Sequence, residues 1–252
     1  MRMNQLTKNE KERLLQFRTT FSADSKITAQ AIRSIDLLDV QFLTSYLYTV
    51  KDTLQAADLL SAASMFSKRY SYLVAVPAFY SFSRFQKQLN VSLKNTELLP
   101  DDSSEIWLPQ LYLTDQHVRN VEQRSADRSR FFQMIFADHF HLIWERLATL
   151  TSISKQTLWE NTAVYLFWIY ETMLNEVKTE AEKAIIQEDF HALLDQSQAY
   201  LFGPYRSNPL SRFYGPKITI DGQDIRFRKT CCFSYQCFDK SIMCHTCPKL
   251  KP

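Results

Sequence analysis

Cysteine is the residue type whose placement in this chain most clearly indicates chemistry. All five cysteines of the 252-residue chain lie in the segment CCFSYQCFDKSIMCHTC, which spans residues 231–247. Cys231 and Cys232 are adjacent, and Cys244 and Cys247 form a C-x2-C pair. Two such pairs supply the four thiolates that an iron–sulfur cluster or a structural zinc ion requires. The segment therefore predicts a metal centre.

The spacing bears on which kind of site this is. Zinc ligands usually come from spacings of two to four residues, which the adjacent Cys231 and Cys232 fit poorly. A two-iron cluster offers two metals, so neighbouring cysteines that point in different directions could both reach it. Disulfides suit small secreted domains, and this chain is not small. We therefore expect a cluster before zinc, and zinc before a disulfide framework.

The residues around these cysteines resemble a known family. Residues 228–235, RKTCCFSY, and residues 244–248, CHTCP, are similar to the C-terminal signature of the FhuF-like ferric siderophore reductases. That family carries a CC-x10-C-x2-C motif that binds one [2Fe-2S] cluster. Here eleven residues separate Cys232 from Cys244, and Cys237 among them leaves a ligand swap open. The resemblance implies that the ligands are Cys231, Cys232, Cys244 and Cys247, with Cys237 as a spare thiol.

Two further segments resemble the same family more weakly. Residues 153–163, ISKQTLWENTA, are similar to the start of a central helix in which glycine is common at the position of Glu160. Residues 208–210, NPL, are also similar. The resemblance covers nearly the whole chain, but only the cysteine signature is specific.

The resemblance implies an electron-transfer enzyme of iron uptake. Its cluster would take one electron from an external donor, such as a ferredoxin or a reductase, and pass it to the Fe(III) of an imported siderophore, for example one of the hydroxamate type. Hard oxygen ligands hold Fe(III) far better than Fe(II), so reduction frees the metal. Two alternatives stay open: a zinc-stabilised binding module without redox activity, and an iron–sulfur sensor.

A ferric siderophore is bulky, rich in oxygen and often anionic, so its docking face should be basic and aromatic. From residue 226 to the end the chain has six basic residues and one acidic residue, Asp239. The candidate substrate contacts, chosen for their proximity in the sequence to the cysteines, are Arg206, Arg212, Tyr214, Arg228 and Lys229.

The composition disfavours a nicotinamide, ATP or Rossmann-type flavin site. The only glycines are Gly203, Gly215 and Gly222, so the chain has neither a G-x-G-x-x-G fingerprint nor a Walker phosphate loop. A reductase of this kind should therefore receive its electrons from another protein. A net charge of +3 gives no reason to expect nucleic acid as a partner.

No transmembrane segment is expected. The longest apolar stretches, around residues 72–80 and 163–170, are shorter than the roughly 20 residues that cross a bilayer. The first residues, MRMNQLTKNEKERLL, lack the apolar core of a signal peptide. We expect a cytoplasmic protein, and leave open a peripheral position at the inner face of the membrane.

Most of the chain shows the apolar periodicity of helices. His139 and His141 are two residues apart, so on a helix they diverge and are expected to be core or surface residues. A proline at position 77 suggests a kinked helix or two helical pieces. The predicted helices cover residues 8–21, with a capping box of Thr7 and Glu10, and residues 29–47, 53–66, 70–89, 129–150, 154–173 and 178–194.

Two regions alternate as strands do. Residues 89–93 and 111–113, with a turn at residues 100–104 between them, predict a small hairpin or meander. Residues 218–227 alternate around Asp221-Gly222, which is a strong hairpin signal. We therefore predict an α+β fold, predominantly helical with a small antiparallel sheet and a C-terminal hairpin supporting the cysteine-ligated cluster. Residues 1–202 would form the scaffold, and residues 203–252 the cluster-binding segment packed on the same domain.

Overall fold

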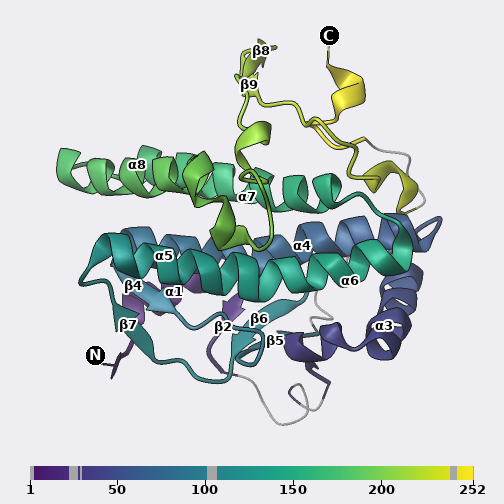
Figure 1. Cartoon of the computed structure of the whole chain (residues 1–252), viewed down its shortest axis with the longest axis horizontal. Coiled ribbons are helices and arrows are strands. Elements are labelled where there is room, and N and C mark those ends of the chain that lie inside the picture. Colours follow the sequence, from purple (N-terminus) through teal and green to yellow (C-terminus); the bar gives the residue numbers. More distant parts are fainter. Residues whose placement is uncertain (1–2, 23–27, 29, 101–106, 239–242, 252) are drawn as a thin grey trace.

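The structure is a computed structural model of the whole chain, and it describes residues 3–22, 28, 30–100, 107–238 and 243–251. Long helices run side by side across the molecule, the strands of the N-terminal half lie below them, and the C-terminal segment with β8 and β9 lies above (Figure 1). Helices thus dominate and the sheets are small and largely antiparallel, as the sequence predicts. The predicted turn at residues 100–104 lies outside the described residues, apart from Pro100.

The short strands form three small sheets. The first has the order β1-β7-β4, the second β2-β6-β5-β3, and the third is the hairpin β8-β9. Helix α1 (Lys8–Leu15) connects the first two sheets, and Thr7 and Glu10 form the predicted capping box at its start. The strands of the first two sheets are β1 (Met3–Asn4), β2 (Thr19–Thr20), β3 (Ile32–Arg33), β4 (Lys87–Leu89), β5 (Thr96–Leu99), β6 (Gln110–Leu113) and β7 (Val118–Asn120).

An antiparallel pair of strands does lie within residues 89–113, but the predicted first strand, residues 89–93, is wrong because only Leu89 of that range is in a strand. β5 pairs antiparallel with β6, whereas Leu89 ends β4, which pairs with β7 in the other sheet. β2 joins β6 in parallel from the N-terminal region. Local alternation of apolar residues indicates a strand but not its partner, so these long-range pairings could not be predicted from the pattern.

The prediction of one helix over residues 29–47 is wrong at its start. Ile32–Arg33 form β3 and Ser34–Leu38 form a 3-10 turn, so α3 covers Val40–Thr53. The reason lies in Asp39, whose side chain accepts a hydrogen bond from the backbone N–H of Phe42 and so begins the helix there. The apolar periodicity continued across this cap and concealed it.

Two of the long helical runs contain a π-helical turn. α4 (Leu59–Tyr80) continues through Pro77 without ending and passes into a π-helical turn at Ser81–Phe85. α5 (Arg124–Ile135), a π-helical turn at Phe136–Phe140 and α6 (His141–Thr151) form one continuous helical run, where the sequence predicts a helix over 129–150. Such turns change which residues face the core.

The C-terminal half follows the predicted order of elements. α7 (Lys155–Glu176) and α8 (Glu180–Leu194) are followed by 3-10 turns at Gln196–Phe202 and Ser211–Phe213. The hairpin of β8 (Ile218–Ile220) and β9 (Gln223–Ile225) is confirmed. Asp221 and Gly222 both have positive φ angles, of 50° and 77°, as the predicted tight turn requires.

One hydrophobic core reaches from Leu6 to Cys237 and includes Leu210 and Phe213 from the region after α8. The C-terminal segment therefore shares the core of the helical scaffold. In the part of the chain that the structure describes, no helix is both long enough and apolar enough to cross a membrane.

His139 is a core residue, as expected. Its Nδ1 lies 2.6 Å from the carbonyl oxygen of Val91 and its Nε2 lies 2.6 Å from the hydroxyl of Tyr70. A neutral ring satisfies both contacts by donating to Val91 and accepting from Tyr70. Burial lowers the pKa of His139 to about 4, and the hydrogen bond to Val91 opposes this only in part.

This burial predicts a pH-dependent stability. Below pH 6.5 the unfolded chain protonates His139 whereas the folded protein does not until about pH 4, so the free energy of unfolding falls across that interval. The total loss from this group is about 3 kcal/mol. Urea unfolding at a series of pH values measures it. The loss of unfolding free energy should be smaller in His139→Gln than in the natural protein. In the control His191→Gln, which changes an exposed histidine, the loss should be unchanged. Equal losses in both variants would contradict the attribution of the pH dependence to His139.

Candidate metal centre

The cysteine segment is held on the surface between α4 and α7, which pack together more extensively than any other pair of elements in the described chain. A row of serines on α4, at spacings of three and four residues, lies in this contact. Small side chains let two helices approach closely, and buried hydroxyls require hydrogen-bond partners. All four are fully buried: Ser61, Ser64, Ser67 and Ser71.

Asn161 on α7 connects this serine row to the cysteine segment. Its Nδ2 donates to the carbonyl oxygen of Ser64 at 2.9 Å and to the hydroxyl of Ser67 at 2.8 Å. Its Oδ1 accepts a hydrogen bond of 2.6 Å from Arg228 Nη2. All the hydrogen-bonding groups of this buried amide are thus directed at fixed partners, so the position of Arg228 follows from that of the two helices.

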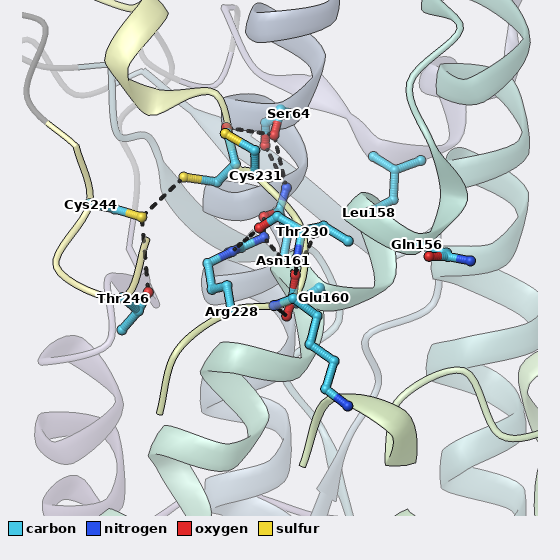
Figure 2. A network of polar contacts seen from close by, with 12 residues as sticks. Ser64, Gln156, Leu158, Glu160, Asn161, Arg228, Thr230, Cys231, Cys244 and Thr246 are labelled. Carbon is cyan, nitrogen blue, oxygen red and sulfur yellow. Dashed lines mark hydrogen bonds and ion pairs between the residues drawn. The ribbon is translucent and has the colours of Figure 1, made fainter. Parts of the chain in front are cut away.

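Glu160, the neighbour of Asn161, holds the backbone just before the first cysteine pair. Its carboxylate accepts the backbone N–H groups of Lys229 at 2.6 Å and Thr230 at 2.7 Å, and also the Thr230 hydroxyl. Arg228 lies 3.7 Å away as an ion-pair partner, and the two side chains are only 2% and 1% exposed. A buried carboxylate needs such partners to offset its lost hydration. Figure 2 shows this network.

The two cysteine pairs meet next to this network. Cys232 Sγ and Cys244 Sγ are 3.4 Å apart (Figure 2). The two parts of the segment are also joined by a hydrogen bond from Arg228 N–H to the Thr246 carbonyl, of 2.9 Å. The backbone of Cys232 is fixed to α4, because its carbonyl oxygen accepts from the Ser64 hydroxyl at 2.8 Å.

The remaining two cysteines lie close to these in the chain. The C-x2-C pair forms a turn in which Cys247 N–H donates to the Cys244 carbonyl at 2.9 Å. Cys231 Sγ accepts from the backbone N–H of Phe233 at 3.4 Å. Among the described residues, however, no three cysteine, histidine or acidic side chains converge on one point.

The thiols of this segment are donors of the kind that a soft metal centre requires. All five thiols are free, and 3.4 Å is too long for a disulfide but close to the about 3.7 Å between two sulfurs on one tetrahedral metal ion. Arg228 Nη1 is buried and finds no hydrogen-bond partner in the described part of the chain. A buried cation with a spare N–H suits a group of negative charge, as a thiolate-ligated cluster is. Cys231, Cys232, Cys244 and Cys247 are the residues that would hold it.

The electrostatics of the sulfur pair agree with this interpretation. Contact with Cys244 lowers the pKa of the Cys232 thiol, and the positive charges of Lys68 and Arg228 act in the same direction. The same contact raises the pKa of Cys244. The cations therefore favour thiolate at this place, as metal binding requires.

Cys237 lies in a different environment. Its side chain is fully buried in the hydrophobic core, and burial raises the pKa of its thiol to about 11. The residues on either side of it are fixed to the connection between α3 and α4, since Phe238 N–H donates to Leu54 and Gln236 accepts from Ala57. The Ser61 hydroxyl also donates to the Gln236 side chain, at 2.7 Å. These contacts make Cys237 a packing residue.

The candidate substrate contacts are distributed around the segment. Arg206, Arg212, Tyr214 and Lys229 are exposed, whereas Arg228 is buried in the polar network. Tyr214 lies under the guanidinium of Arg226, 4.4 Å from its ring centre. The structure therefore separates Arg228 from the other four candidates. One cavity near the segment is lined by Tyr214, and two others are lined by residues that directly precede the first cysteine pair.

The first cavity, the hairpin cavity, has a volume of about 470 Å³ and lies between α7, β9 and the turn of the second cysteine pair. Its basic side chains are paired with carboxylates of the same wall. Glu171 binds Lys217 at 2.8 Å and Arg226 at 2.7 Å, and Glu160 binds Arg228. It is lined by Glu160, Val164, Phe167, Trp168, Glu171, Phe213, Lys217, Gln223, Asp224, Ile225, Arg226, Phe227, Arg228, His245 and Thr246.

The second cavity, the Lys229 cavity, has a volume of about 460 Å³ and lies on the other side of residues 226–230, at the start of α7. Its lining contains three basic residues and no acidic residue, together with three aromatic rings. The lining residues are Lys155, Gln156, Trp159, Gln196, Tyr205, Ser207, Asn208, Pro209, Ser211, Arg212, Phe213 and Lys229.

Sequence reasoning missed the residues that hold the segment. Glu160 and Asn161 stand in a run singled out only for its family resemblance, with no role given to them. Four serines at helical spacing in an otherwise apolar helix were a usable signal, because buried hydroxyls in such a row must meet another polar element.

Comparison with known proteins places the chain in a family. The family model described as "Ferric iron reductase FhuF-like transporter" matches residues 64–217, which is more than half of the chain. The chain therefore belongs to the FhuF-like ferric iron reductase family. The match includes the serine row from Ser64 onward, Glu160 and Asn161, and ends before the first cysteine.

Two other comparisons add little. No curated protein matches the chain. A solved structure, aerobactin synthetase IucC from a hypervirulent pathotype of Klebsiella pneumoniae, is similar with 15% sequence identity and a TM-score of 0.41. The similarity covers 65% of this chain and 35% of that one, so the chain spans about a third of its length. A likeness this weak carries no argument.

The polar network makes a prediction about Glu160. In Glu160→Gln the Lys229 and Thr230 N–H groups lose their charged acceptor and Arg228 loses its ion-pair partner, so the free energy of unfolding should fall by about 3 kcal/mol. The freed segment should also expose the first cysteine pair, so its alkylation in metal-free protein should accelerate. Mass spectrometry of timed alkylation measures this. Glu171→Gln, which breaks ion pairs that do not hold residues 228–230, is the control. Equal alkylation rates in the natural protein and both variants would contradict the role of Glu160 in holding the segment.

Proposed function

We propose that the chain is an iron–sulfur reductase that transfers one electron to the Fe(III) of a siderophore and so releases Fe(II). The observation that carries this proposal is the meeting of the two cysteine pairs, with 3.4 Å between Cys232 and Cys244, beside two cavities and a buried arginine. Membership of a ferric iron reductase family supports it.

A [2Fe-2S] cluster, when bound by Cys231, Cys232, Cys244 and Cys247, would supply a carrier for one electron between an external donor and Fe(III). The donor would be another protein, such as a ferredoxin or a reductase. The part of the protein itself is to hold the thiolates and to place the substrate beside them.

The protein residues have separate parts in this proposal. Glu160 and Asn161 hold residues 228–230 and hence the first cysteine pair, which keeps the distance from cluster to substrate constant. Arg228 places a buried positive charge next to the sulfurs, and such a charge favours the reduced, more negative form of the centre. No acid, base or nucleophile is required.

The substrate chemistry follows from the metal. Hydroxamate and other hard oxygen ligands bind Fe(III) far more tightly than Fe(II), so one electron weakens the chelate and its oxygens regain protons as the metal leaves. Intact ferric siderophores would be encountered after import, and we propose the cytosol as the place of reaction. Hydroxamate siderophores are the first substrates to try.

Single cysteine variants test the ligand set. Each of the four variants Cys231→Ser, Cys232→Ser, Cys244→Ser and Cys247→Ser should lose the cluster. Cys237→Ser should retain about two irons and two sulfides per chain. Iron, sulfide and zinc analysis of anaerobically purified variants, together with visible absorption spectra, gives the answer. Cys237→Ser is the matched control, because it removes a thiol of the same segment.

Two results would favour the alternative functions. One zinc per chain in the natural protein, retained after attempted reconstitution with iron and sulfide, would replace the reductase by a zinc-stabilised binding module. An intact cluster that no ferric chelate reoxidises would indicate a sensor. Loss of the cluster in Cys237→Ser but not in one of the four other variants would reassign that ligand.

A further inference from the structure

The two cavities beside the cysteine segment differ in charge, and this difference bears on the substrate. In the hairpin cavity the basic side chains are neutralised within the wall: Lys217 and Arg226 by Glu171, and Arg228 by Glu160. A negatively charged ligand would have to compete with these carboxylates, and it would also meet Asp224. That cavity is therefore poorly suited to an anion.

The Lys229 cavity has the opposite character. Arg212 and Lys229 are exposed, and no ion-pair partner is present for either among the described residues. Lys155 is paired with Glu145 at 2.6 Å, but Glu145 is not part of the wall. Two uncompensated cations thus face one hollow of about 460 Å³, a size that accommodates a small metal chelate.

The backbone adds to this positive character. α7 begins at Lys155 with Ser154 as its N-cap, and its first two residues line the cavity. The first N–H groups of a 22-residue helix and its dipole favour negative charge at this end. Unlike the side chains, this contribution is fixed in place.

The remaining wall is suited to an oxygen-rich, partly planar ligand. Trp159 Nε1 donates to the Tyr205 hydroxyl at 3.0 Å, which fixes both rings in the wall. The amides of Asn208 and Gln196 are already hydrogen-bonded within the protein and help to fix the shape of the wall. Lys229 stands two residues before Cys231, and Glu160 fixes its backbone N–H. A chelate in this cavity would therefore lie beside the first cysteine pair.

We propose that the Lys229 cavity binds iron chelates with free carboxylate groups and a net negative charge, in preference to neutral or cationic hydroxamate chelates. This rests on the proposed function only for the claim that the bound metal is then reduced. The binding itself requires Arg212, Lys229 and the start of α7, and no cluster chemistry.

Binding is tested with gallium(III), which replaces Fe(III) in chelates but is not reduced under these conditions. Full-length protein is titrated with Ga(III)–citrate, an anion, and with the Ga(III) complex of desferriferrichrome, which is neutral. Calorimetry measures affinity, and quenching of Trp159 fluorescence, absent in Trp159→Phe, reports the location. We expect the anionic chelate to bind at least about tenfold more tightly.

Charge variants locate the site. Arg212→Gln and Lys229→Gln should each weaken Ga(III)–citrate binding about tenfold and reduce its dependence on salt. Lys217→Gln, in the hairpin cavity, is the matched control and should leave binding unchanged. A loss caused by Lys217→Gln with no loss from Arg212→Gln and Lys229→Gln would overturn the proposal, and so would equal affinity for the two chelates.

The two proposals fail in different ways. If Ga(III)–citrate binds as expected but reduced protein passes no electron to ferric citrate or to ferric hydroxamates, the anion site stands and the reductase function fails. If reduced protein reacts rapidly with ferric hydroxamates while Ga(III)–citrate does not bind, the reductase function stands and the anion site is overturned.

Discussion

The buried guanidinium of Arg228 is the interaction on which the candidate site depends. The guanidinium binds Asn161 and Glu160 on α7. The backbone N–H of Arg228 donates to the carbonyl of Thr246, in the loop of the second cysteine pair. One residue therefore connects the scaffold to both halves of the cysteine segment. Because its charge is buried, removal of Glu160 would leave that charge without its ion-pair partner and weaken the connection.

The pairing of α4 with α7 makes this interaction possible. The serine row of α4 keeps the two helices close and supplies hydroxyls to Asn161, Thr162 and the backbone of Cys232. The same helix start that supplies Glu160 also forms one wall of the Lys229 cavity. The first cysteine pair, a buried positive charge and the Lys229 cavity are thus all positioned by one pair of helices, which accounts for a cysteine segment with little secondary structure of its own.

The family and the position of a candidate metal centre could be predicted from the sequence, whereas the residues that hold the cysteine segment could not. Clustering of five cysteines indicated a metal centre, and Asp221-Gly222 indicated the hairpin, because both signals are local. Capping at Asp39 and the pairing of β4 with β7 could not be read from apolar periodicity. The contact of Glu160 with residues 229 and 230 joins positions about seventy apart in the chain, and single-sequence patterns carry no information on such pairs. Arg228 was predicted as a substrate contact from its place in the sequence, whereas its burial is a property of the fold.

The most direct test of the account is a single-turnover reaction under anaerobic conditions. Protein with its cluster is reduced by dithionite, freed of excess reductant and mixed with one equivalent of a ferric hydroxamate or ferric citrate, while the visible absorption and the Fe(II) released to a ferrous chelator are recorded. The account predicts that the bleached absorption returns and that about one Fe(II) appears for each electron held. A protein that binds no iron and sulfide, or that stays bleached in the presence of every ferric chelate, would contradict it.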